Sequence, residues 1–254
     1  MNTLDAIFTG RSVRHYLQEK LDWEEIADIL DYANDLPKLT DSISVEFKLV
    51  SNIETKQGFR GPFSIKAPYY LCISSEEKED YLLNAGYLMQ QLNLYLISRG
   101  LGTCYMGASP GMGLKGTMKY SYVVALAFGK PAAPLPREKS EAKRLPEKDL
   151  VVYKEQVSSD IRQLLTAART APSSYNSQPW RFVVYKNRIH IFTRKTLLLT
   201  KVFDHMKMVD MGIMLANLMM AAEELWVDVS LGKLDNLKSK PLQNNEYIRT
   251  VLIG

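Results

Sequence analysis

Residues 168–184 read Ala-Arg-Thr-Ala-Pro-Ser-Ser-Tyr-Asn-Ser-Gln-Pro-Trp-Arg-Phe-Val-Val. We expect a helix that ends before Pro172, because a proline ring forbids helical continuation, and a strand that begins after Pro179. Between the two prolines, Ser173, Ser174 and Asn176 offer hydrogen-bond donors and acceptors. A loop this rich in polar groups, placed between a helix and a strand, indicates a site for a polar ligand.

The same loop also has a purely structural interpretation. Serine and asparagine side chains bond to their own backbone in turns, so Ser173, Ser174 and Asn176 could serve the turn alone. The later residues Gln178 and Trp180 favour a structural role, because they fix the path from loop to strand and bury a large indole surface. Both interpretations of the loop remain open at this point.

A second polar segment, Gly-Arg-Ser-Val-Arg at 10–14, follows a short helix expected over residues 3–9. Arg11 and Arg14 present two guanidinium groups, which suit a phosphate because each can donate parallel hydrogen bonds. The alternative is that both arginines cap the helix carbonyls or pair with surface acids.

Four segments together resemble the FMN-dependent nitroreductase family, and the resemblance extends along most of the chain. They are Arg-Ser-Val-Arg at 11–14, Gly-Leu-Gly-Thr-Cys-Tyr-Met-Gly at 100–107, Lys143-Arg144, and Pro-Ser-Ser-Tyr-Asn-Ser-Gln-Pro-Trp at 172–180. The resemblance implies an α+β fold in which a mixed sheet is flanked by helices. It also implies that the protein binds FMN.

The resemblance further implies a set of FMN-binding residues, which are Arg11, Ser12, Arg14, Gly107, Ala108, Lys143, Arg144, Pro172, Ser173, Ser174 and Asn176. Arg11 is expected nearer the phosphate. Arg14 is expected nearer N1 and O2 of the flavin ring, where a cation stabilises the negative charge of the reduced ring. Backbone amides near Gly107 and Ala108 are expected to approach N5. The alternative for Lys143 and Arg144 is a pair of solvated linker charges.

The chain contains an internal repeat, visible when residues 25–52 are laid without gaps on residues 160–187. The matched pairs include Ile26 with Ile161, Leu30 with Leu165, Ala33 with Ala168 and Pro37 with Pro172. Farther on, an apolar helix that opens at Gly86 parallels one that opens at Gly212. Repeated units imply related substructures. Because nitroreductase-like proteins commonly build their flavin sites between two subunits, the resemblance implies an intramolecular pseudo-dimer that carries both halves in one chain.

The two copies are unequal, which predicts how many flavins bind. In the first half the polar loop has become Pro-Lys-Leu-Thr-Asp at 37–41, and the phosphate-binding positions of the second half hold Pro146, Glu147 and Asp149. Acidic groups there would repel a phosphate dianion. We therefore expect one FMN per chain, between the halves, with its phosphate on the first half and its ring edge or ribityl chain touching the second.

Periodicity and turn residues predict helices interleaved with strands in each copy, which is typical of an α+β sandwich. We expect helices near 3–9, 22–35, 78–99, 156–170 and 206–226, and strands at 45–51, 69–74, 121–128, 181–186, 189–193, 227–231 and 246–253. Lys-Pro-Ala-Ala-Pro-Leu-Pro at 130–136 cannot form a helix, and a charged run follows it. We expect a first half at 1–135, a linker at 136–155 and a second half at 156–254.

Composition argues against several classes of protein. A net charge of +4, spread widely over 254 residues, gives no nucleic-acid footprint. The N-terminus lacks the pattern of a secretory signal, and residues 206–226 carry too many charges to span a membrane. Cys72 and Cys104 lie in apolar runs without metal or redox spacing, which favours reduced thiols in a cytoplasmic protein. The three histidines are scattered, so we expect no metal site.

These observations lead to an FMN-dependent oxidoreductase that takes hydride from NADH or NADPH onto flavin N5 and passes it to a small acceptor such as a nitroaromatic or a quinone. The flavin carries out the redox chemistry, so no catalytic side chain is required. A flavin-binding or sensing protein without turnover is an alternative, and a flavin-free scaffold is another. We expect a monomer, since the chain already contains both halves of the usual dimer.

Overall fold

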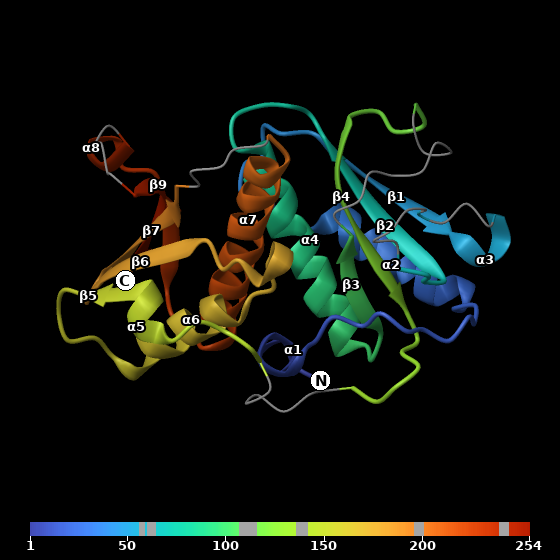
Figure 1. Cartoon of the computed structure of the whole chain (residues 1–254), viewed down its shortest axis with the longest axis horizontal. Helices are drawn as coiled ribbons and strands as arrows, with labels where there is room; N and C mark the ends of the chain where they lie inside the picture. The colour runs from blue at the N-terminus through green and yellow to red at the C-terminus, as the bar shows by residue number, and fades with distance from the viewer. Residues whose placement is uncertain (56–58, 60–64, 107–115, 136–141, 196–200, 239–243) are drawn as a thin grey trace.

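Two long helices, α4 (Tyr81–Ser98) and α7 (Lys201–Glu224), pack against each other at the centre of the molecule (Figure 1). They belong to a computed structural model that describes the chain except for residues 56–58, 60–64, 107–115, 136–141, 196–200 and 239–243. Both helices are apolar around most of their circumference, as expected of helices that are buried on all sides.

The first half of the chain forms a four-stranded antiparallel sheet beside α4. Its strands are β1 (Val45–Ser51), β2 (Tyr69–Ser75), β3 (Gly102–Met106) and β4 (Ser121–Gly129), in the order β1-β2-β4-β3. The other helices of this half are α1 (Thr3–Thr9), α2 (Trp23–Asp35) and the short α3 (Asn52–Thr55). Every residue of β2 is buried, which fits its central place in the sheet.

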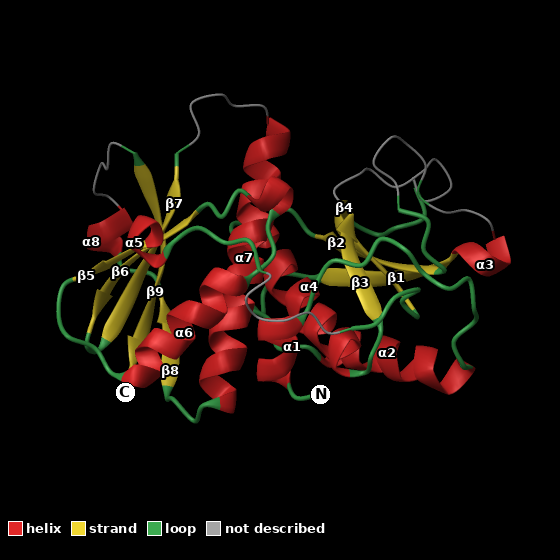
Figure 2. Cartoon of the chain, turned by 60° about the horizontal axis from the view of Figure 1, so that its bottom comes forward, coloured by secondary structure: helices red, strands yellow, loops and turns green. Residues whose placement is uncertain are grey.

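The second half forms a five-stranded sheet, and Figure 2 shows α4 and α7 lying between the two sheets. Its strands are β5 (Val151–Tyr153), β6 (Trp180–Tyr185), β7 (Arg188–Arg194), β8 (Val229–Gly232) and β9 (Asn245–Ile253). Their order is β5-β6-β7-β9-β8, with β5 parallel to β6 and the other neighbours antiparallel. The remaining elements are α5 (Glu147–Leu150), α6 (Ser159–Thr170), the 3-10 turn η2 (Ser174–Asn176) and α8 (Asp235–Lys238).

The two halves share one topology. The strand order β6-β7-β9-β8 has the same connectivity as β1-β2-β4-β3, and β5 is an addition at the edge. In each half one amphipathic helix, α2 or α6, precedes the first of these strands, and one long helix, α4 or α7, lies between the second and the third. This correspondence is what a duplicated unit would produce.

The helices α2 and α6 bury equivalent faces. Ile26 and Ile29 of α2 are buried, as are Ile161 and Leu165 of α6, and the spacing in both cases is that of one helical stripe. The Ser158 hydroxyl accepts a hydrogen bond from the Ile161 amide and so caps the start of α6. The predicted end of this helix before Pro172 is confirmed, since α6 ends at Thr170.

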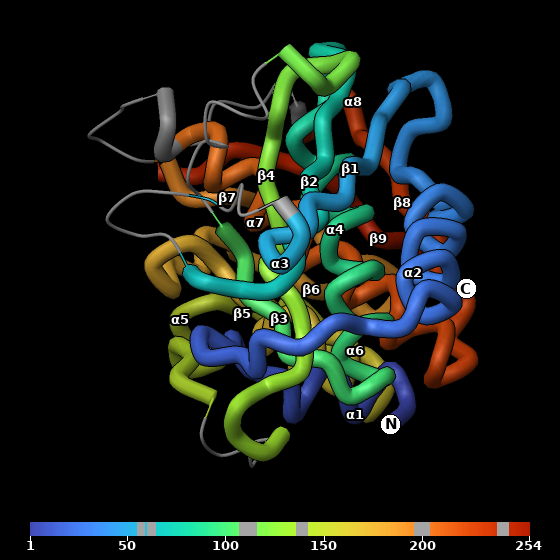
Figure 3. Tube along the Cα trace, turned by 90° about the vertical axis from the view of Figure 1, so that its right-hand side faces the viewer, coloured from blue at the N-terminus to red at the C-terminus, as the bar shows by residue number. Residues whose placement is uncertain are grey.

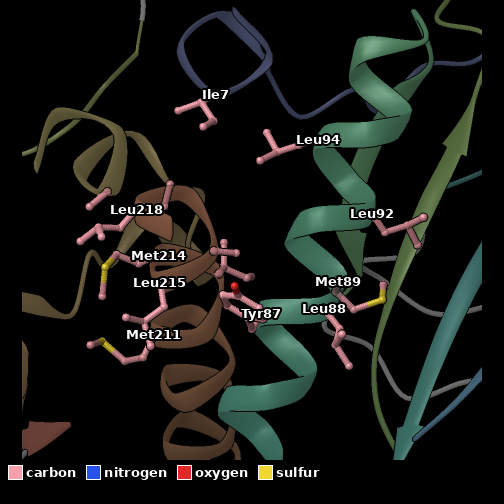
Figure 4. Close-up of a cluster of buried hydrophobic side chains, with 14 of the residues drawn as sticks. Ile7, Tyr87, Leu88, Met89, Leu92, Leu94, Met211, Met214, Leu215 and Leu218 are labelled. Carbon is pink, nitrogen blue, oxygen red and sulfur yellow. The ribbon is translucent and has the colours of Figure 1, made fainter. Parts of the chain in front are cut away.

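One large apolar cluster contains residues of both halves, and a smaller one belongs to the first half. Figure 4 shows part of the large cluster, with buried side chains on α1, α4 and α7. They include Ile7, Leu88, Met89, Leu92, Leu94, Met211, Met214, Leu215 and Leu218. Because α4 and α7 bury their sides in this common cluster, the two halves depend on each other for their core.

The helix expected near 206–226 corresponds to α7, which ends at Glu224 and is buried over its middle part. Met211, Met214, Leu215 and Leu218 are each 0% exposed. Within the described residues, no helix combines the length and the apolarity needed to cross a membrane.

The predicted α+β class is confirmed, and the predicted helices and strands are present with somewhat different ends. The strand β3 and the short helices α3, α5 and α8 are not among the predicted elements. The helix α7 begins at Lys201 rather than near residue 206. The expected linker 136–155 contains α5 and β5, and β5 pairs with β6, so this end of the segment is part of the second sheet. A strand of three residues gives too little periodicity to be distinguished from a charged linker.

Candidate functional site

The segment after α1 is fixed beside the edge strand β3. Gly10 closes α1, and a Cβ at this position would lie 2.5 Å from the Ala6 carbonyl oxygen and 3.0 Å from a methyl group of Ile97 in α4. The chain then joins β3, since Ser12 forms a parallel bridge with Thr103 and the Val13 amide donates to the Thr103 carbonyl at 2.7 Å. Figure 3 shows this blue N-terminal chain passing β3. Arg11 and Arg14 are thereby held on either side of the bridge.

The polar loop of the second half turns sharply after Pro172. Tyr175, Asn176 and Gln178 have φ values of 53°, 54° and 46°, in the left-handed region that non-glycine residues seldom adopt. Such residues cost roughly 1 kcal/mol or more each and persist only where the surroundings hold them. Further contacts must therefore stabilise this turn.

Gln178 supplies one set of those contacts. Its amide N–H donates to the Ser173 hydroxyl at 3.0 Å, and its Nε2 donates to the Asn176 carbonyl at 3.2 Å. Its Oε1 accepts a hydrogen bond from the Leu145 amide at 2.8 Å. Gln178 is 2% exposed and Trp180 is fully buried, so both have the structural role that the sequence favoured.

Asp210 of α7 supplies the other set. The Ser174 amide donates to both carboxylate oxygens of Asp210 at 3.0 Å, and the Ser174 hydroxyl donates to Oδ1 at 3.1 Å. Asp210 is 2% exposed, and this burial raises the pKa of its carboxyl to about 7, although hydrogen bonds from Ser174 and Ser177 oppose the shift. The turn is thus tied to the central helix pair.

Lys143 and Arg144 lie against the same turn. The Arg144 guanidinium donates to the Thr170 carbonyl through Nε at 3.2 Å and through Nη2 at 2.8 Å, so its charge faces the C-terminal end of α6. Arg144 also donates to Asn176 Oδ1 at 3.3 Å, and Asn176 Nδ2 donates to the Lys143 carbonyl at 3.1 Å. These bonds make the basic pair part of the turn rather than a freely solvated linker.

The three segments meet around a cavity of about 520 Å³. The predicted residues that line it are Arg11, Ser12, Arg14, Lys143, Arg144, Pro172, Ser173 and Asn176. They come from both halves of the chain. Four of them are cationic, and no carboxylate belongs to the wall among the residues that the structure describes. The cavity is therefore suited to an anionic small molecule of cofactor size.

The remaining predicted residues do not contribute to this described wall. Ser174 points instead to Asp210, as described above. Gly107 and Ala108 lie outside the described residues. In the parts of the chain that the structure describes, no group of three His, Cys, Asp or Glu side chains could hold a metal ion.

One wall of the cavity carries polar side chains that we did not predict. Tyr105 donates to Gln90 Oε1 at 2.9 Å, Gln90 Nε2 donates to Asn217 Oδ1 at 2.7 Å, and Asn93 Nδ2 donates to Gln90 Oε1 at 3.1 Å. Asn217 Nδ2 completes the chain by donating to the Ala167 carbonyl at 3.0 Å. The signal in the sequence is the presence of amide side chains within long apolar helices.

An apolar wall complements these polar groups. Ala6 and Ile7 of α1 face the cavity together with Leu94 and Ile97 of α4. Cys104 also lines it, and burial raises the pKa of this thiol. The site therefore combines cationic, neutral polar and apolar surfaces, which is the composition that a ring bearing a charged tail requires.

Comparison with known proteins identifies what this chain resembles. The family model described as "Putative TM nitroreductase" matches residues 2–222. A solved structure of a "putative nitroreductase" from Thermotoga maritima matches with a TM-score of 0.67 at 20% sequence identity, covering 100% of this chain and 94% of that one. At this identity the likeness shows the fold.

Shorter proteins match as well. A nitroreductase with bound FMN from Desulfitobacterium hafniense has a TM-score of 0.46 at 18% identity, covering 61% of this chain and 100% of its own. An FMN-dependent nitroreductase from Clostridium difficile has a TM-score of 0.44 at 19% identity, covering 61% of this chain and 98% of its own. No curated protein matches the chain significantly.

Proposed function

The chain belongs to the TM nitroreductase family, and on this premise we propose that it is an FMN-dependent oxidoreductase. The observation that carries the proposal is the cavity of about 520 Å³, where Arg11 and Arg14 from one half meet Ser173 and Asn176 from the other. Its volume lies within the range of small-molecule sites, roughly 300–1,000 Å³.

The residues present fit FMN. The phosphate of FMN is an anion, and Arg11, Lys143 and Arg144 place cationic groups around the cavity. Its ring is flat and largely apolar, and Leu94 and Ile97 offer an apolar wall. The ring edge and the ribityl chain carry donors and acceptors, for which the same cavity has serine and asparagine side chains.

Each residue has a role in this proposal. Arg11, Lys143 and Arg144 hold the phosphate, while Ser12, Pro172, Ser173 and Asn176 contact the ribityl chain or the ring edge. Arg14 would serve N1 and O2 of the ring, where a cation would favour the reduced form. Gly107 and Ala108, which lie outside the described residues, would supply amides to N5. Ser174 has no ligand contact in this proposal, because its polar atoms face Asp210.

FMN, when bound, supplies a hydride-accepting centre, which is why no side chain needs to act as a nucleophile. The chain itself binds and orients the ring, and it presents a cationic wall to the charge that develops there. We propose NADH or NADPH as the electron donor and a small nitroaromatic or quinone as the acceptor. A further proposal is a cytoplasmic location, which suits the free, buried thiols of Cys72 and Cys104.

We also propose that the chain is a duplicated pseudo-dimer that acts as a monomer, with a first half at 1–135, a connecting segment at 136–155 whose strand β5 joins the second sheet, and a second half at 156–254. The shared strand order of the two sheets supports this division. The second FMN site of such a pair would use residues 37–41 and 146–149. Leu39 replaces a serine there, and Glu147 starts the short helix α5, so we expect one FMN per chain.

A flavin-binding or sensing protein without turnover is the second candidate. The observation that favours it is the lack of a carboxylate or an imidazole among the described lining residues, since these groups are the ones that most often protonate a reduced acceptor near neutral pH. NAD(P)H oxidation in the presence of a nitroaromatic or a quinone separates the two candidates, because only the enzyme gives steady turnover.

The ratio of flavin to polypeptide tests the proposed function itself. The purified protein is incubated with excess FMN, freed of unbound ligand, denatured, and assayed for released flavin by absorbance. One FMN per chain is expected. A protein that stays colourless would refute the proposal, and uptake of two flavins with equal affinity would refute the single site.

A further inference from the structure

The turn that carries Ser173 and Asn176 is held from behind by a buried carboxylate. Three hydrogen bonds connect Asp210 to Ser174, two from the amide N–H at 3.0 Å and one from the hydroxyl at 3.1 Å. The Ser177 side chain donates a further hydrogen bond to the same carboxyl. An ionised carboxylate accepts all of these donors, because it has acceptor positions on both oxygens and no proton of its own.

Asp210 does not line the cavity, but its neighbours along the turn do. Ser173, Tyr175 and Asn176 face the cavity, whereas Ser174 between them faces the opposite way. Tyr175 and Asn176 are held at positive φ, which needs support from surrounding contacts. Gln178 and the Lys143-Arg144 pair supply part of that support at Asn176, and Asp210 supplies it at Ser174, directly beside Ser173 and Tyr175.

The other half of the chain contains the same arrangement with an amide in place of the carboxylate. The Leu39 amide donates to Asn84 Oδ1 at 2.9 Å. Leu39 corresponds to Ser174 when residues 25–52 are laid on 160–187, and Asn84 corresponds to Asp210 when Gly86 is laid on Gly212. Asn84 is 0% exposed, and its Nδ2 has no hydrogen-bond partner among the described residues. In the first half an amide accepts a hydrogen bond from one backbone N–H. In the second half a carboxylate accepts hydrogen bonds from a backbone N–H and from two serine side chains.

We propose that Asp210 is the positioning residue of the cavity turn, its ionised carboxylate holding Ser174 so that Ser173 and Asn176 face the ligand. This role rests on the proposed function, because FMN is taken as the ligand whose binding Asp210 affects. Protonation of Asp210 adds an O–H donor next to the donors of Ser174 and Ser177, so the turn becomes looser and FMN binds more weakly.

The surroundings of Asp210 contribute few other charges. Tyr105 of β3 lies close enough for its titration to be affected by Asp210, and its hydroxyl is neutral because burial raises its pKa. On α7 itself, Lys207 pairs with Asp204 at 3.0 Å. Tyr87 of α4 has a raised pKa through burial and is also neutral. On the far side of the turn, Arg144 bonds to Asn176 and to the Thr170 carbonyl.

The test compares Asp210→Asn with the matched control Asn84→Ala, which removes the equivalent hydrogen bond from the half without the polar loop. FMN titration at pH 8, followed by protein fluorescence or flavin absorbance, should show the dissociation constant of Asp210→Asn raised about tenfold or more. Asn84→Ala should bind FMN within about twofold of the wild type. Lowering the pH from 8 to 6 should weaken FMN binding more steeply in the wild type than in Asp210→Asn. The FMN phosphate titrates equally in both experiments, so its effect cancels when the two proteins are compared.

Hydrogen exchange of the ligand-free protein gives a readout that does not depend on FMN. The Ser174 amide should exchange faster in Asp210→Asn than in the wild type and be unchanged in Asn84→Ala. Wild-type affinity together with wild-type protection in Asp210→Asn would overturn the positioning role while leaving the FMN function intact. Conversely, a wild type that binds no FMN refutes the function, and the exchange rates still decide the role of Asp210.

If Asp210→Asn does not fold, Ser174→Ala provides the same test with the carboxylate in place. This variant loses the hydroxyl bond to Asp210 and keeps the amide bonds. Its FMN dissociation constant should rise by roughly threefold to tenfold, and the Ser174 segment should exchange faster. Unchanged affinity and exchange would count against the proposal.

Discussion

Gly86 of α4 and Gly212 of α7 occupy corresponding places where the two helices cross. A Cβ on Gly86 would lie 2.1 Å from the Val209 carbonyl oxygen, and a Cβ on Gly212 would lie 2.0 Å from the Leu83 carbonyl oxygen. Each glycine therefore lies against the backbone of the opposite helix, at the residue one turn before that helix's own glycine. The contact is reciprocal, as it would be across a two-fold axis between the halves, and it allows the helices to approach with backbone against backbone.

Alanine at either glycine should destabilise the protein strongly. The added methyl group would meet a carbonyl of the opposite helix, which cannot move without separating α4 from α7. We expect Gly86→Ala and Gly212→Ala each to lower the free energy of unfolding by about 3 kcal/mol, measured by urea denaturation. Gly232→Ala is the control, since its Cβ would meet only the Thr250 carbonyl at 4.0 Å. Equal stability of all four proteins would show that the crossing is looser than described.

Arg11 and Arg14 should be required for flavin retention. The double variant Arg11→Ala/Arg14→Ala removes two of the four cations that line the cavity, so we expect FMN to be lost on gel filtration while circular dichroism stays unchanged. The charge-matched control is Lys20→Ala/Lys130→Ala, because these lysines form exposed ion pairs with Glu54 and Glu19. A folded arginine variant that keeps wild-type flavin content would contradict the assignment of both residues.

The buried carboxyl of Asp210 should make stability depend on pH. Its pKa is about 7 in the folded protein and about 3.8 in the unfolded chain. Folding thus takes up a proton between these values, and the contribution of this group to stability is fully present below about pH 3.8 and is lost as the pH rises through about 7. A shift of this size corresponds to roughly 4 kcal/mol.

Asp210→Asn tests that dependence, since the amide cannot ionise. Relative to the wild type, the variant should gain stability as the pH rises from 4 to 8, by an amount approaching a few kcal/mol in urea denaturation. The variant should thus gain stability relative to the wild type toward pH 8, where it should nevertheless bind FMN more weakly. A difference between the two proteins that stays constant across this pH range would mean that Asp210 titrates normally.

The sequence predicted those parts of the fold that local patterns determine. The helical stripes of α2 and α6 follow from apolar spacing, and the end of α6 follows from the proline ring at 172. The family resemblance and the internal repeat predict that Arg11 and Ser173 line one site. The composition of either segment alone does not predict that the two lie close together.

Other features depend on contacts between distant residues, which local patterns do not encode. Ser174 was assigned to the ligand because its residue type suits one, but the direction of its hydroxyl is set by Asp210 on another helix. The composition of residues 206–226 predicts a helix, but it does not predict the partners of Asp210 and Asn217 within it. Their partners, Ser174 and Gln90, are determined by the packing of α7 against the turn and against α4. The short strand β5 is likewise a strand because it pairs with β6.

The buried bond between Gln90 and Asn217 should couple the two long helices energetically. Gln90 Nε2 donates to Asn217 Oδ1 at 2.7 Å, and both residues are 1% exposed. Leucine at 90 leaves Asn217 Oδ1 without its donor, and leucine at 217 leaves Gln90 Nε2 without its acceptor, each at a cost of about 2 kcal/mol in the free energy of unfolding. Leucine at 90 also removes the acceptor of Tyr105 and Asn93, but this loss is common to the single and the double variant and cancels in the coupling. The double variant should cost less than the sum by about 1–2 kcal/mol, because the second change removes the group that the first one left unpaired.

Urea denaturation of the four proteins in this double-mutant cycle measures the coupling. The exposed ion pair of Lys20 and Glu54, whose side chains are 63% and 61% exposed, is the control pair and should couple by less than about 1 kcal/mol. Strictly additive losses at Gln90 and Asn217 would mean that each amide finds another partner when its neighbour is removed. A coupling as large as we expect would instead show that the polar wall of the cavity also joins the first half of the chain to the second.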